Sequence, residues 1–362
     1  MLSFFLPVFL VLLMIGLPVF FGLLLAPGIL LWLNGQERDI ALLYRNVYNG
    51  IDSFPLMALP FFVLAGELMN KGGITNRLVE FSQALMGHLR GGLAHVNILS
   101  SILFAGLSGS AVADTSALGS TLIPAMERNG YSRRFAAAVT AASSVIGPII
   151  PPSGIMIIYA YVMGESVAAL FLAGIVPGIL VGVGLMLVVR LMADRYDLPK
   201  AERIVHPGQT IGALEHWVSF VLLRVNLAGL LAATVFGLAA LAGVEALPRG
   251  WVVFALMLIP AHLWLMAMRG RVSHDFRLIC KKAVAPLQTP IIILGGILIG
   301  VFTPTEASAV AVGYALLVSW GVLRTMRLAD LPDILRRAAI SSATVLLLVG
   351  ASVAFKTVVS LS

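Results

Sequence analysis

Long apolar stretches recur along this chain of 362 residues, and they limit its fold more than any other feature. A helix needs about 20 apolar residues to cross a bilayer. Stretches of that kind lie at 3–33, 54–70, 166–190, 217–244, 250–268, 283–301, 304–323 and 338–360. Only 11% of the residues are charged, too few to coat a water-soluble surface of this size. The sequence therefore predicts an all-α polytopic protein in a lipid bilayer, and it disfavours a soluble enzyme or a nucleic-acid binder.

The segment 71–90 is polar and separates two apolar regions. Leu78, Phe81, Leu85 and Leu89 recur at helical spacing on one face, and the charged side chains fall elsewhere. This pattern predicts an amphipathic helix that lies along the membrane surface. The alternative is an ordinary loop helix that packs on the protein.

The distribution of basic residues predicts the orientation of the chain. If 91–126 enters and leaves the membrane on one side and 133–163 crosses once, several loops share a face: 71–93, 127–134, 190–216, 269–282 and 324–337. Those loops hold 19 of the 24 Lys and Arg residues, and the opposite loops hold three. Cytoplasmic loops carry such an excess, so this face is predicted to be cytoplasmic. An ordinary crossing at 91–126 would split the basic loops between the two faces, so the count supports a re-entrant hairpin.

The segment GLSGSAVADT at 106–115 lies between two apolar arms of about 12–15 residues, each too short to span a bilayer. Its glycines and serines allow a tight turn with exposed carbonyl and hydroxyl oxygens. Such oxygens are costly at membrane depth unless a ligand binds them, and a sodium ion would do so. Asp114 is a candidate functional residue because it is ionisable and lies inside a membrane segment. The alternative is that Asp114 caps the second arm, which is compatible with a binding site.

The segment SSVIGPIIPPSG at 143–154 interrupts an apolar stretch that runs from 135 to 163. Its three prolines and two nearby glycines predict an unwound helix. A break at the membrane midplane exposes carbonyls on one side and N–H groups on the other, as transporter sites do. The alternative is a simple proline kink, for which one proline would suffice.

A third polar segment, Thr303-Pro304-Thr305-Glu306, lies between two apolar stretches on the outer face. Thr305 is predicted to cap the following helix, with Glu306 in its first turn. This structural role is favoured over a role for Glu306 in proton coupling.

No sequence feature indicates an enzyme. A Gly-rich phosphate loop followed by Lys and Ser or Thr is missing, and the six histidines lack metal-ligand spacing. No cofactor is therefore predicted.

Two basic residues fall inside predicted spans. Arg224 can reach the basic face with its long side chain, whereas the sequence offers no partner for Lys356.

Several motifs occur in the order and spacing of a known family. They are ALPFFVLAGELM with a following GGI, SGSAVADTSALGSTLIPAMERNGY, SSVIGPIIPPS, FLAGIVPGIL and IIILGGILIGVFTPTEASAVAV. In these motifs the chain resembles the large membrane subunit, DctM type, of tripartite ATP-independent periplasmic (TRAP) transporters. The likeness covers roughly 1–200 and 280–362.

The resemblance implies the architecture and partners of that family. Its members belong to the ion transporter superfamily and have two inverted repeats, each with scaffold helices, a surface arm helix, a re-entrant hairpin and a broken helix. They work with a small four-helix membrane subunit and a periplasmic substrate-binding protein in the bacterial cytoplasmic (inner) membrane. A sodium gradient drives uptake of an organic acid, such as a C4-dicarboxylate or a sialic acid, through an elevator motion.

Carried onto this chain, the resemblance implies a site for sodium and substrate in two parts. The hairpin tip would bind sodium through Ser108, Gly109 and Ser110, with Asp114 and Thr115 following in the second arm. The unwound helix would complete the site with Gly147, Pro151, Pro152 and Ser153.

These interpretations divide the chain into consecutive parts. They are N-terminal scaffold helices (1–70), the arm helix (71–90), the first transport repeat (91–165), a span with a cytoplasmic loop (166–205), a two-span insertion (206–275) and the start of a second repeat (276–362). A second hairpin and a second Pro-Pro break do not follow, so the second repeat is expected to be incomplete. Residues 1–362 alone are then not expected to transport.

Other functional hypotheses stay open at this point. One is a single-component anion transporter of the same superfamily, which needs no periplasmic partner. Another is an inactive, truncated protein that holds half of a site. A membrane enzyme or a structural scaffold is disfavoured, because the first needs an acid–base or metal constellation and the second needs no broken helices. The sequence does not identify the substrate.

Overall fold

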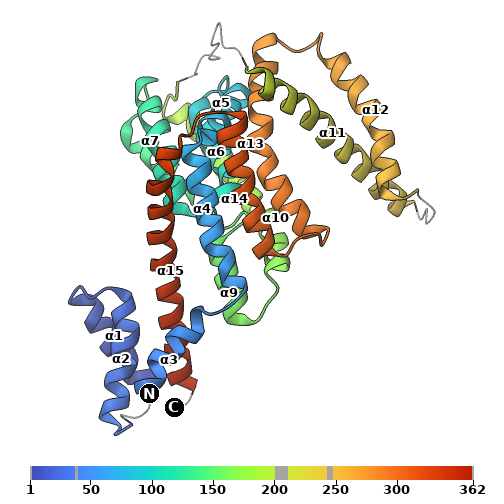
Figure 1. Ribbon diagram of the computed structural model, residues 1–362. Coiled ribbons are helices and arrows are strands. Elements are labelled where there is room, and N and C mark those ends of the chain that lie inside the picture. The colour runs from blue at the N-terminus through green and yellow to red at the C-terminus, as the bar shows by residue number, and fades with distance from the viewer. Residues whose placement is uncertain (1, 37–39, 200–210, 243–247, 361–362) are drawn as a thin grey trace.

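A computed structural model describes residues 2–36, 40–199, 211–242 and 248–360, which fold into helices joined by turns (Figure 1). Within this described part, six helices are long and apolar enough to cross a membrane. They are α10 (Val167–Arg195), α11 (Ala213–Leu241), α12 (Gly250–Met268), α13 (His274–Leu298), α14 (Pro304–Leu316) with its π-helical continuation to Val322, and α15 (Leu331–Ser360). The predicted all-α, multi-span class is confirmed.

A bent helix pair supplies a further candidate span. Helix α3 (Ile40–Ile51) and helix α4 (Ala58–Lys71) meet at an angle of 67° across a short break. The segment of α3 is not among the apolar stretches that the sequence predicts to span the membrane. Its Leu43 side chain is nevertheless buried beside Ala354 and Val358 of α15. Helix α3 is therefore held in place by its contact with α15, a helix that is distant in the sequence.

The apolar stretch 3–33 forms two helices, α1 (Leu2–Met14) and α2 (Val19–Leu33). The turn between them contains Gly16, which has a φ of +91°, followed by Pro18. Phe5 of α1 stacks on Phe355 of α15, with ring centroids 4.1 Å apart. The N-terminal helices therefore pack against the far end of α15 (Figure 1).

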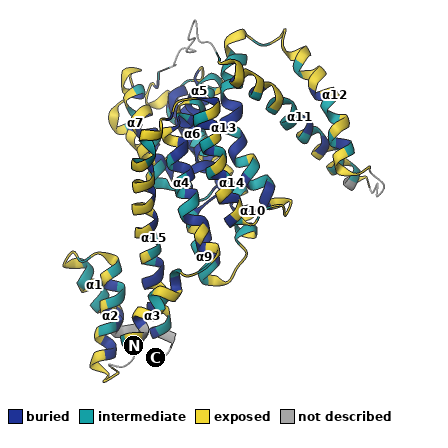
Figure 2. Cartoon of the chain, viewed as in Figure 1, coloured by how far each residue is buried: buried dark blue, intermediate teal, exposed yellow. Residues whose placement is uncertain are grey.

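One large apolar core joins the helices of the central bundle. It is built mainly from α4, α5, α6, α7, α13 and α14, whose buried side chains include Phe62, Leu68, Phe104, Leu118 and Ile293. Helix α15 runs along this bundle, whereas the α11–α12 hairpin leans away from it (Figure 1). Buried residues concentrate in the bundle, and exposed residues follow α11 and α12 (Figure 2). Exposed apolar side chains on those two helices suit contact with lipid.

Helix α5 (Ile74–Met86) occupies the predicted arm segment, but its buried face differs from the predicted one. Ile74, Leu78, Val79 and Ser82 are buried, whereas Leu85 is 38% exposed. The buried face packs on α6 and α13, so the helix contacts the protein along one side. Its position along a membrane surface stays a prediction.

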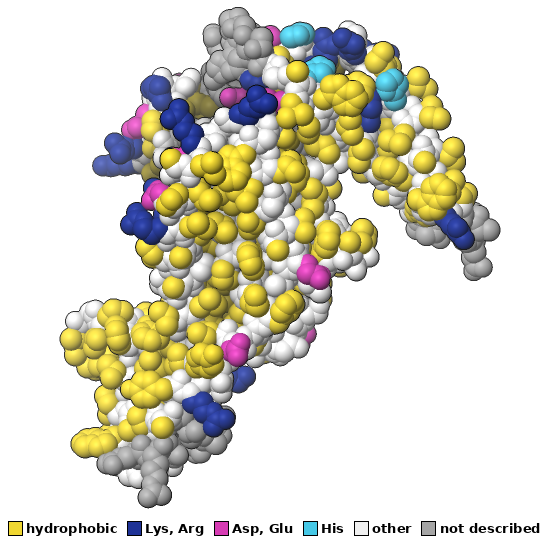
Figure 3. Space-filling model, viewed as in Figure 1, with side chains coloured by type: hydrophobic (Ala, Val, Ile, Leu, Met, Phe, Trp, Pro, Cys, Tyr) yellow, Lys and Arg dark blue, Asp and Glu magenta, His cyan; other side chains and the backbone are white. Residues whose placement is uncertain are grey.

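Ion pairs bring three of the predicted cytoplasmic loops to one end of the molecule. Lys71 lies 3.4 Å from Asp330, and Arg90 lies 2.6 Å from Asp194. Arg77 pairs with the buried carboxylate of Glu215 at the start of α11. Most Lys and Arg side chains gather toward the same end in Figure 3. This arrangement agrees with the shared basic face that the positive-inside count predicts.

The cap of α14 corrects one prediction. Thr303, not Thr305, is the N-cap residue: its hydroxyl accepts from the Glu306 N–H at 3.3 Å, and the Glu306 carboxylate accepts from the Thr303 N–H at 2.8 Å. This reciprocal pair is a capping box, which requires a spacing of three residues. Thr305 instead donates its hydroxyl to the Phe54 carbonyl at 3.2 Å. The structural role of Glu306 is confirmed, and the predicted cap residue is wrong.

Candidate functional site

A helical hairpin occupies the segment where the sequence predicts a re-entrant turn. Helix α6 (Gly92–Ser108) and helix α7 (Ala111–Arg128) are joined only by Gly109 and Ser110. Gly109 has a φ of +60°, and the Ser110 hydroxyl caps α7 by accepting from the Ala113 N–H at 3.4 Å. At 1.5 Å per residue α6 is about 25 Å long, less than the roughly 30 Å of a hydrocarbon core. Its length therefore suits an arm that turns back within the membrane.

The helix break also lies where the sequence predicts it. Helix α8 (Arg133–Ser144) ends before the proline-rich segment, and helix α9 (Gly154–Met163) begins after it. The Pro151–Pro152 peptide bond is cis. Ser153 caps α9 by accepting from the Met156 N–H at 3.3 Å, and it donates to the Pro148 carbonyl at 2.7 Å. These two hydrogen bonds of Ser153 connect the unwound segment to the start of α9.

The hairpin tip contacts the break through the backbone of both. A Cβ atom added to Gly109 would overlap the carbonyl oxygen of Pro152 and would lie 3.1 Å from the Cα of Ser153. A Cβ on Gly106 would lie 3.1 Å from the Pro290 ring of α13 and 3.8 Å from the Pro151 carbonyl. Only glycine allows the two segments to approach this closely.

Asp114 lies in the first turn of α7 and is fully buried between the tip and the break. The Ser108 hydroxyl donates to its Oδ1 atom, whereas its Oδ2 atom has no hydrogen-bond partner. Oδ2 lies directly against Gly147, where a Cβ atom would overlap it. Among the described residues, no Lys or Arg forms an ion pair with Asp114. A buried carboxylate oxygen without a partner is costly, and it fits a bound cation.

Two C-terminal and two N-terminal helix ends, which carry opposite partial charges, lie near the contact between the hairpin tip and the break. Helix α6 ends at Ser108, and Gly147 follows the end of α8, so two C-terminal ends flank Asp114. Helices α7 and α9 begin beside the contact between Gly109 and Pro152. C-terminal helix ends favour cations and N-terminal ends favour anions. The helix ends near Asp114 can therefore favour a cation, and the starts of α7 and α9 can favour an anionic group.

The structure brings together most of the residues that the sequence singled out. The residues in this contact are Ser108, Gly109, Ser110, Asp114, Gly147, Pro151, Pro152 and Ser153. Thr115 is exposed and donates its hydroxyl to the Ala111 carbonyl of its own helix at 2.8 Å. The structure places Thr115 outside the buried contact.

A buried polar network that the sequence did not predict ties the first arm of the hairpin to α8. Asn97 donates to the Thr140 hydroxyl at 2.7 Å and accepts from the Ser143 hydroxyl at 3.1 Å. Ser101 donates to Ser143 at 2.9 Å. All four side chains have 0% exposure. On each helix these polar residues are three or four positions apart, a spacing that places them on one face. That spacing does not show that the two helices face each other.

We expect Asn97→Leu to destabilise the protein by about 1–2 kcal/mol, because it leaves two buried hydroxyl groups with fewer partners. Thermal unfolding in detergent would measure the change as a lower Tm. Asn129→Leu is the matched control, since Asn129 is exposed at the end of α7 and bonds only to its own helix. Equal Tm values for both variants would contradict the proposed importance of the network.

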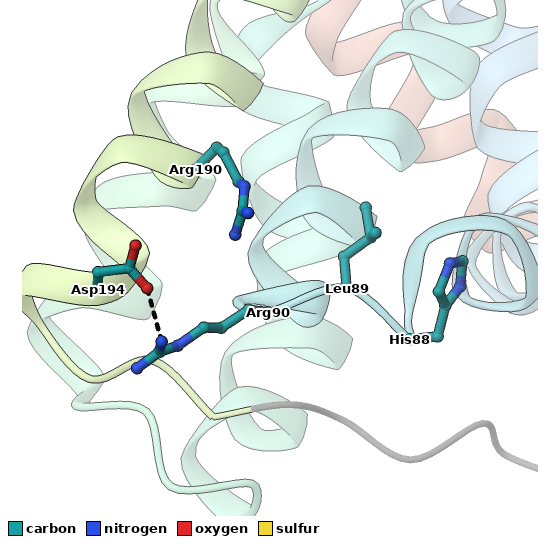
Figure 4. A pocket seen from close by; sticks show the side chains of 5 residues that line it. All are labelled: His88, Leu89, Arg90, Arg190 and Asp194. Atoms are coloured by element: carbon teal, nitrogen blue, oxygen red, sulfur yellow. Dashed lines mark hydrogen bonds and ion pairs between the residues drawn. The ribbon is translucent and has the colours of Figure 1, made fainter.

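A surface hollow near the start of α6 is separate from the hairpin tip (Figure 4). It is lined by His88, Leu89, Arg90, Arg190 and Asp194. Arg90 donates to Asp194 at 2.6 Å and to Asp197 at 2.9 Å, so it fastens α6 to the end of α10. The hollow and the tip lie at opposite ends of α6, about 25 Å apart by helix rise. We therefore assign the hollow a structural role.

Comparison with known proteins identifies the family. Residues 6–362 match the family described as "Tripartite ATP-independent periplasmic transporter, DctM component". The 2,3-diketo-L-gulonate TRAP transporter large permease protein YiaN of Escherichia coli is 36% identical over 93% of this chain. The sialic acid TRAP transporter large permease protein SiaM of Vibrio cholerae is 35% identical over 93%. The C4-dicarboxylate TRAP transporter large permease protein DctM of Pseudomonas aeruginosa is 33% identical over 87%.

The chain spans 64%, 63% and 57% of the lengths of these three relatives, respectively. The family match covers nearly the whole chain, and the family consists of transporter components, which confirms that the chain is not an enzyme. The multi-span helical fold agrees with that assignment. The chain belongs to the DctM family of large permease components of TRAP transporters.

Proposed function

We propose that this chain forms part of the large permease subunit of a sodium-coupled secondary transporter that imports an organic anion. The observation that carries the proposal is the buried, unpartnered Oδ2 atom of Asp114, held between the hairpin tip and the helix break. The proposed sodium ligands are this oxygen and the oxygens around Ser108, Gly109 and Ser110. Sodium is a hard cation that binds oxygen atoms, and its charge would balance the buried carboxylate.

The proposed substrate is a carboxylate. Relatives named for 2,3-diketo-L-gulonate, sialic acid and C4-dicarboxylates all carry the names of organic acids. The N-terminal ends of α7 and α9, capped by Ser110 and Ser153, meet beside Pro151 and Pro152. Their N–H groups favour an anionic group at that place. The proposed substrate contacts are therefore the first N–H groups of α7 and α9.

The proposed mechanism is an elevator motion. The hairpin α6–α7 and the broken helix α8–α9 would move together, because the network around Asn97 joins them. The N-terminal helices of residues 1–70 would belong to the stationary scaffold. The division of the chain at 1–70, 71–90, 91–165, 166–205, 206–275 and 276–362, with the last part belonging to a second inverted repeat, is part of this proposal.

The proposed partners are a small four-helix membrane subunit and a periplasmic substrate-binding protein, in the bacterial inner membrane. The tripartite description of the family supports both. The substrate-binding protein would deliver the organic anion to the hairpin tip. The single-component alternative predicts that transport needs no such protein.

Uptake by proteoliposomes tests the proposal. The natural protein, reconstituted with its proposed small subunit and binding protein, should take up a labelled organic acid when sodium is outside. Potassium in place of sodium, or omission of the binding protein, should reduce uptake to background. Equal uptake in potassium would refute sodium coupling, and equal uptake without the binding protein would favour the single-component alternative.

A further inference from the structure

A second cluster of charged side chains lies between α11, α12 and α13, away from the hairpin. His216, Phe220 and Arg224 recur at intervals of four residues, so they lie on one face of α11. His262 of α12 and Lys281 of α13 approach the same face. Histidine and basic side chains are visible where these helices meet, at the upper right of Figure 3. We call these five residues the α11–α13 basic cluster.

Arg224 is held in a defined position by a ring nitrogen, a backbone carbonyl and an aromatic ring. Its Nε donates to the Nδ1 atom of His262 at 2.9 Å, and its Nη1 donates to the Phe220 carbonyl at 2.7 Å. Its guanidinium carbon lies 3.2 Å from the centre of the Phe220 ring. The side chain therefore points back along α11 toward the basic face, as a long cationic side chain in a membrane helix does. None of these contacts neutralises its charge.

Lys281 brings a second cation to the cluster. Its Nζ lies 3.3 Å from the Nδ1 atom of His216, and Ser219 donates to its backbone carbonyl at 2.6 Å. Lys281 is repelled by the positive charges of three arginines, Arg269, Arg277 and Arg224. Like charges that lie close together repel one another.

Within the described residues, the nearby carboxylates of Glu215 and Asp275 pair with other side chains, Arg77 and His274. In that part of the chain, none of Arg224, Arg269, Arg277 and Lys281 forms an ion pair. The Nε atom of Arg277 is buried without a hydrogen-bond partner. The cluster can therefore attract an anion from outside the described part of the chain.

The surroundings indicate a lipid. Only 17% of the apolar window of α11 and 11% of that of α12 are buried, so both helices expose apolar side chains beside the cluster. Trp217 and Trp264, on the same two helices, are 68% and 54% exposed. Exposed tryptophan side chains prefer the level of the lipid headgroups. The cluster thus combines a cationic centre with apolar walls and an aromatic rim at the membrane interface.

We propose that the α11–α13 basic cluster binds the phosphate group of an anionic phospholipid from the cytoplasmic leaflet, with its acyl chains against α11 and α12. Arg224 and Lys281 bind the phosphate, while His262 and His216 hold these two side chains in place. The bound lipid relieves the repulsion among the cations and covers exposed apolar side chains of α11 and α12. This role is independent of sodium and substrate binding at the hairpin.

Native mass spectrometry of the delipidated natural protein tests the proposal. We expect one phosphatidylglycerol to be retained in preference to phosphatidylcholine. Arg224→Gln with Lys281→Gln should weaken phosphatidylglycerol binding about 30-fold, since each basic residue contributes about 1 kcal/mol to attraction of an anionic lipid. Arg337→Gln is the matched control, because Arg337 lies on the same basic face but pairs with Asp333 at 2.8 Å. It should retain the lipid.

Two further measurements keep the proposal open to refutation. The charge-conserving variant Arg224→Lys with Lys281→Arg should keep most of the preference for phosphatidylglycerol. If it loses the lipid as fully as the glutamine variant, the residues act only in packing and the proposal fails. Displacement of the lipid by inorganic phosphate in excess would show a site for a soluble anion and would also overturn the proposal.

Discussion

Asp114→Asn should strongly weaken the sodium dependence of uptake by the reconstituted transporter and leave membrane insertion intact. The substitution preserves the size of the side chain and removes its charge. It thus removes the negative charge from the buried oxygen beside Gly147, which has no hydrogen-bond partner. Loss of a charged ligand in a buried site costs about 3 kcal/mol, which corresponds to an increase of about 100-fold in the sodium concentration for half-maximal uptake.

Sodium titration of uptake is the measurement for Asp114→Asn. The matched control is Ser116→Ala, which alters an exposed residue of the same helix and should leave the sodium dependence unchanged. Normal sodium dependence in Asp114→Asn would remove Asp114 from the proposed site. Uptake that follows a proton gradient instead of a sodium gradient in the unaltered protein would show that the carboxyl group serves a proton.

Gly109→Ala should reduce uptake to about 1% or less, because a displacement of about 1 Å at a site can cost a factor of 100. Its Cβ atom would collide with the Pro152 carbonyl oxygen, which is a backbone atom and not the end of a flexible side chain. The hairpin tip and the break would have to separate. The core of the bundle does not depend on this contact, so the amount of inserted protein should not change.

Gly164→Ala is the control that distinguishes the steric collision in Gly109→Ala from the strain of a left-handed backbone. Gly164 has a φ of +72°, close to the +60° of Gly109, but a Cβ atom there would meet nothing within 4 Å. Both alanine variants carry the same left-handed backbone penalty of about 1–2 kcal/mol. Uptake should therefore fall in Gly109→Ala and persist in Gly164→Ala. An equal loss in both would mean that strain, not contact between tip and break, causes the effect.

Local features of the sequence are sufficient to predict the hairpin and the break. The sequence predicts apolar arms of about 12–15 residues on either side of Gly109, and the structure extends them to helices of 17 and 18 residues. The prolines at 148, 151 and 152 cannot continue a helix. Both signals depend on residues close together in the chain. The structure accordingly has helix ends at Ser108 and Ser144.

Contacts between residues far apart in the chain could not be predicted from the sequence. Lys356 had no evident partner, but its Nζ donates to the Val162 carbonyl at the end of α9, 3.4 Å away. Such a carbonyl lies at the negative end of a helix and accepts a cation. Glu215 at the start of α11 likewise meets Arg77 of α5. Neither contact has a signature in the neighbouring residues.

The sequence by itself determined the membrane class, most of the spans, the shared basic face and the places where helices must turn or break. These properties follow from hydrophobicity, charge and backbone freedom, which each residue carries into any fold. Only the tertiary structure decided that Asp114 Oδ2 is buried without a partner against Gly147 and that Thr115 is exposed on the same helix. Those outcomes depend on how α7 is rotated against the break, and that rotation is set by packing among helices far apart in the chain.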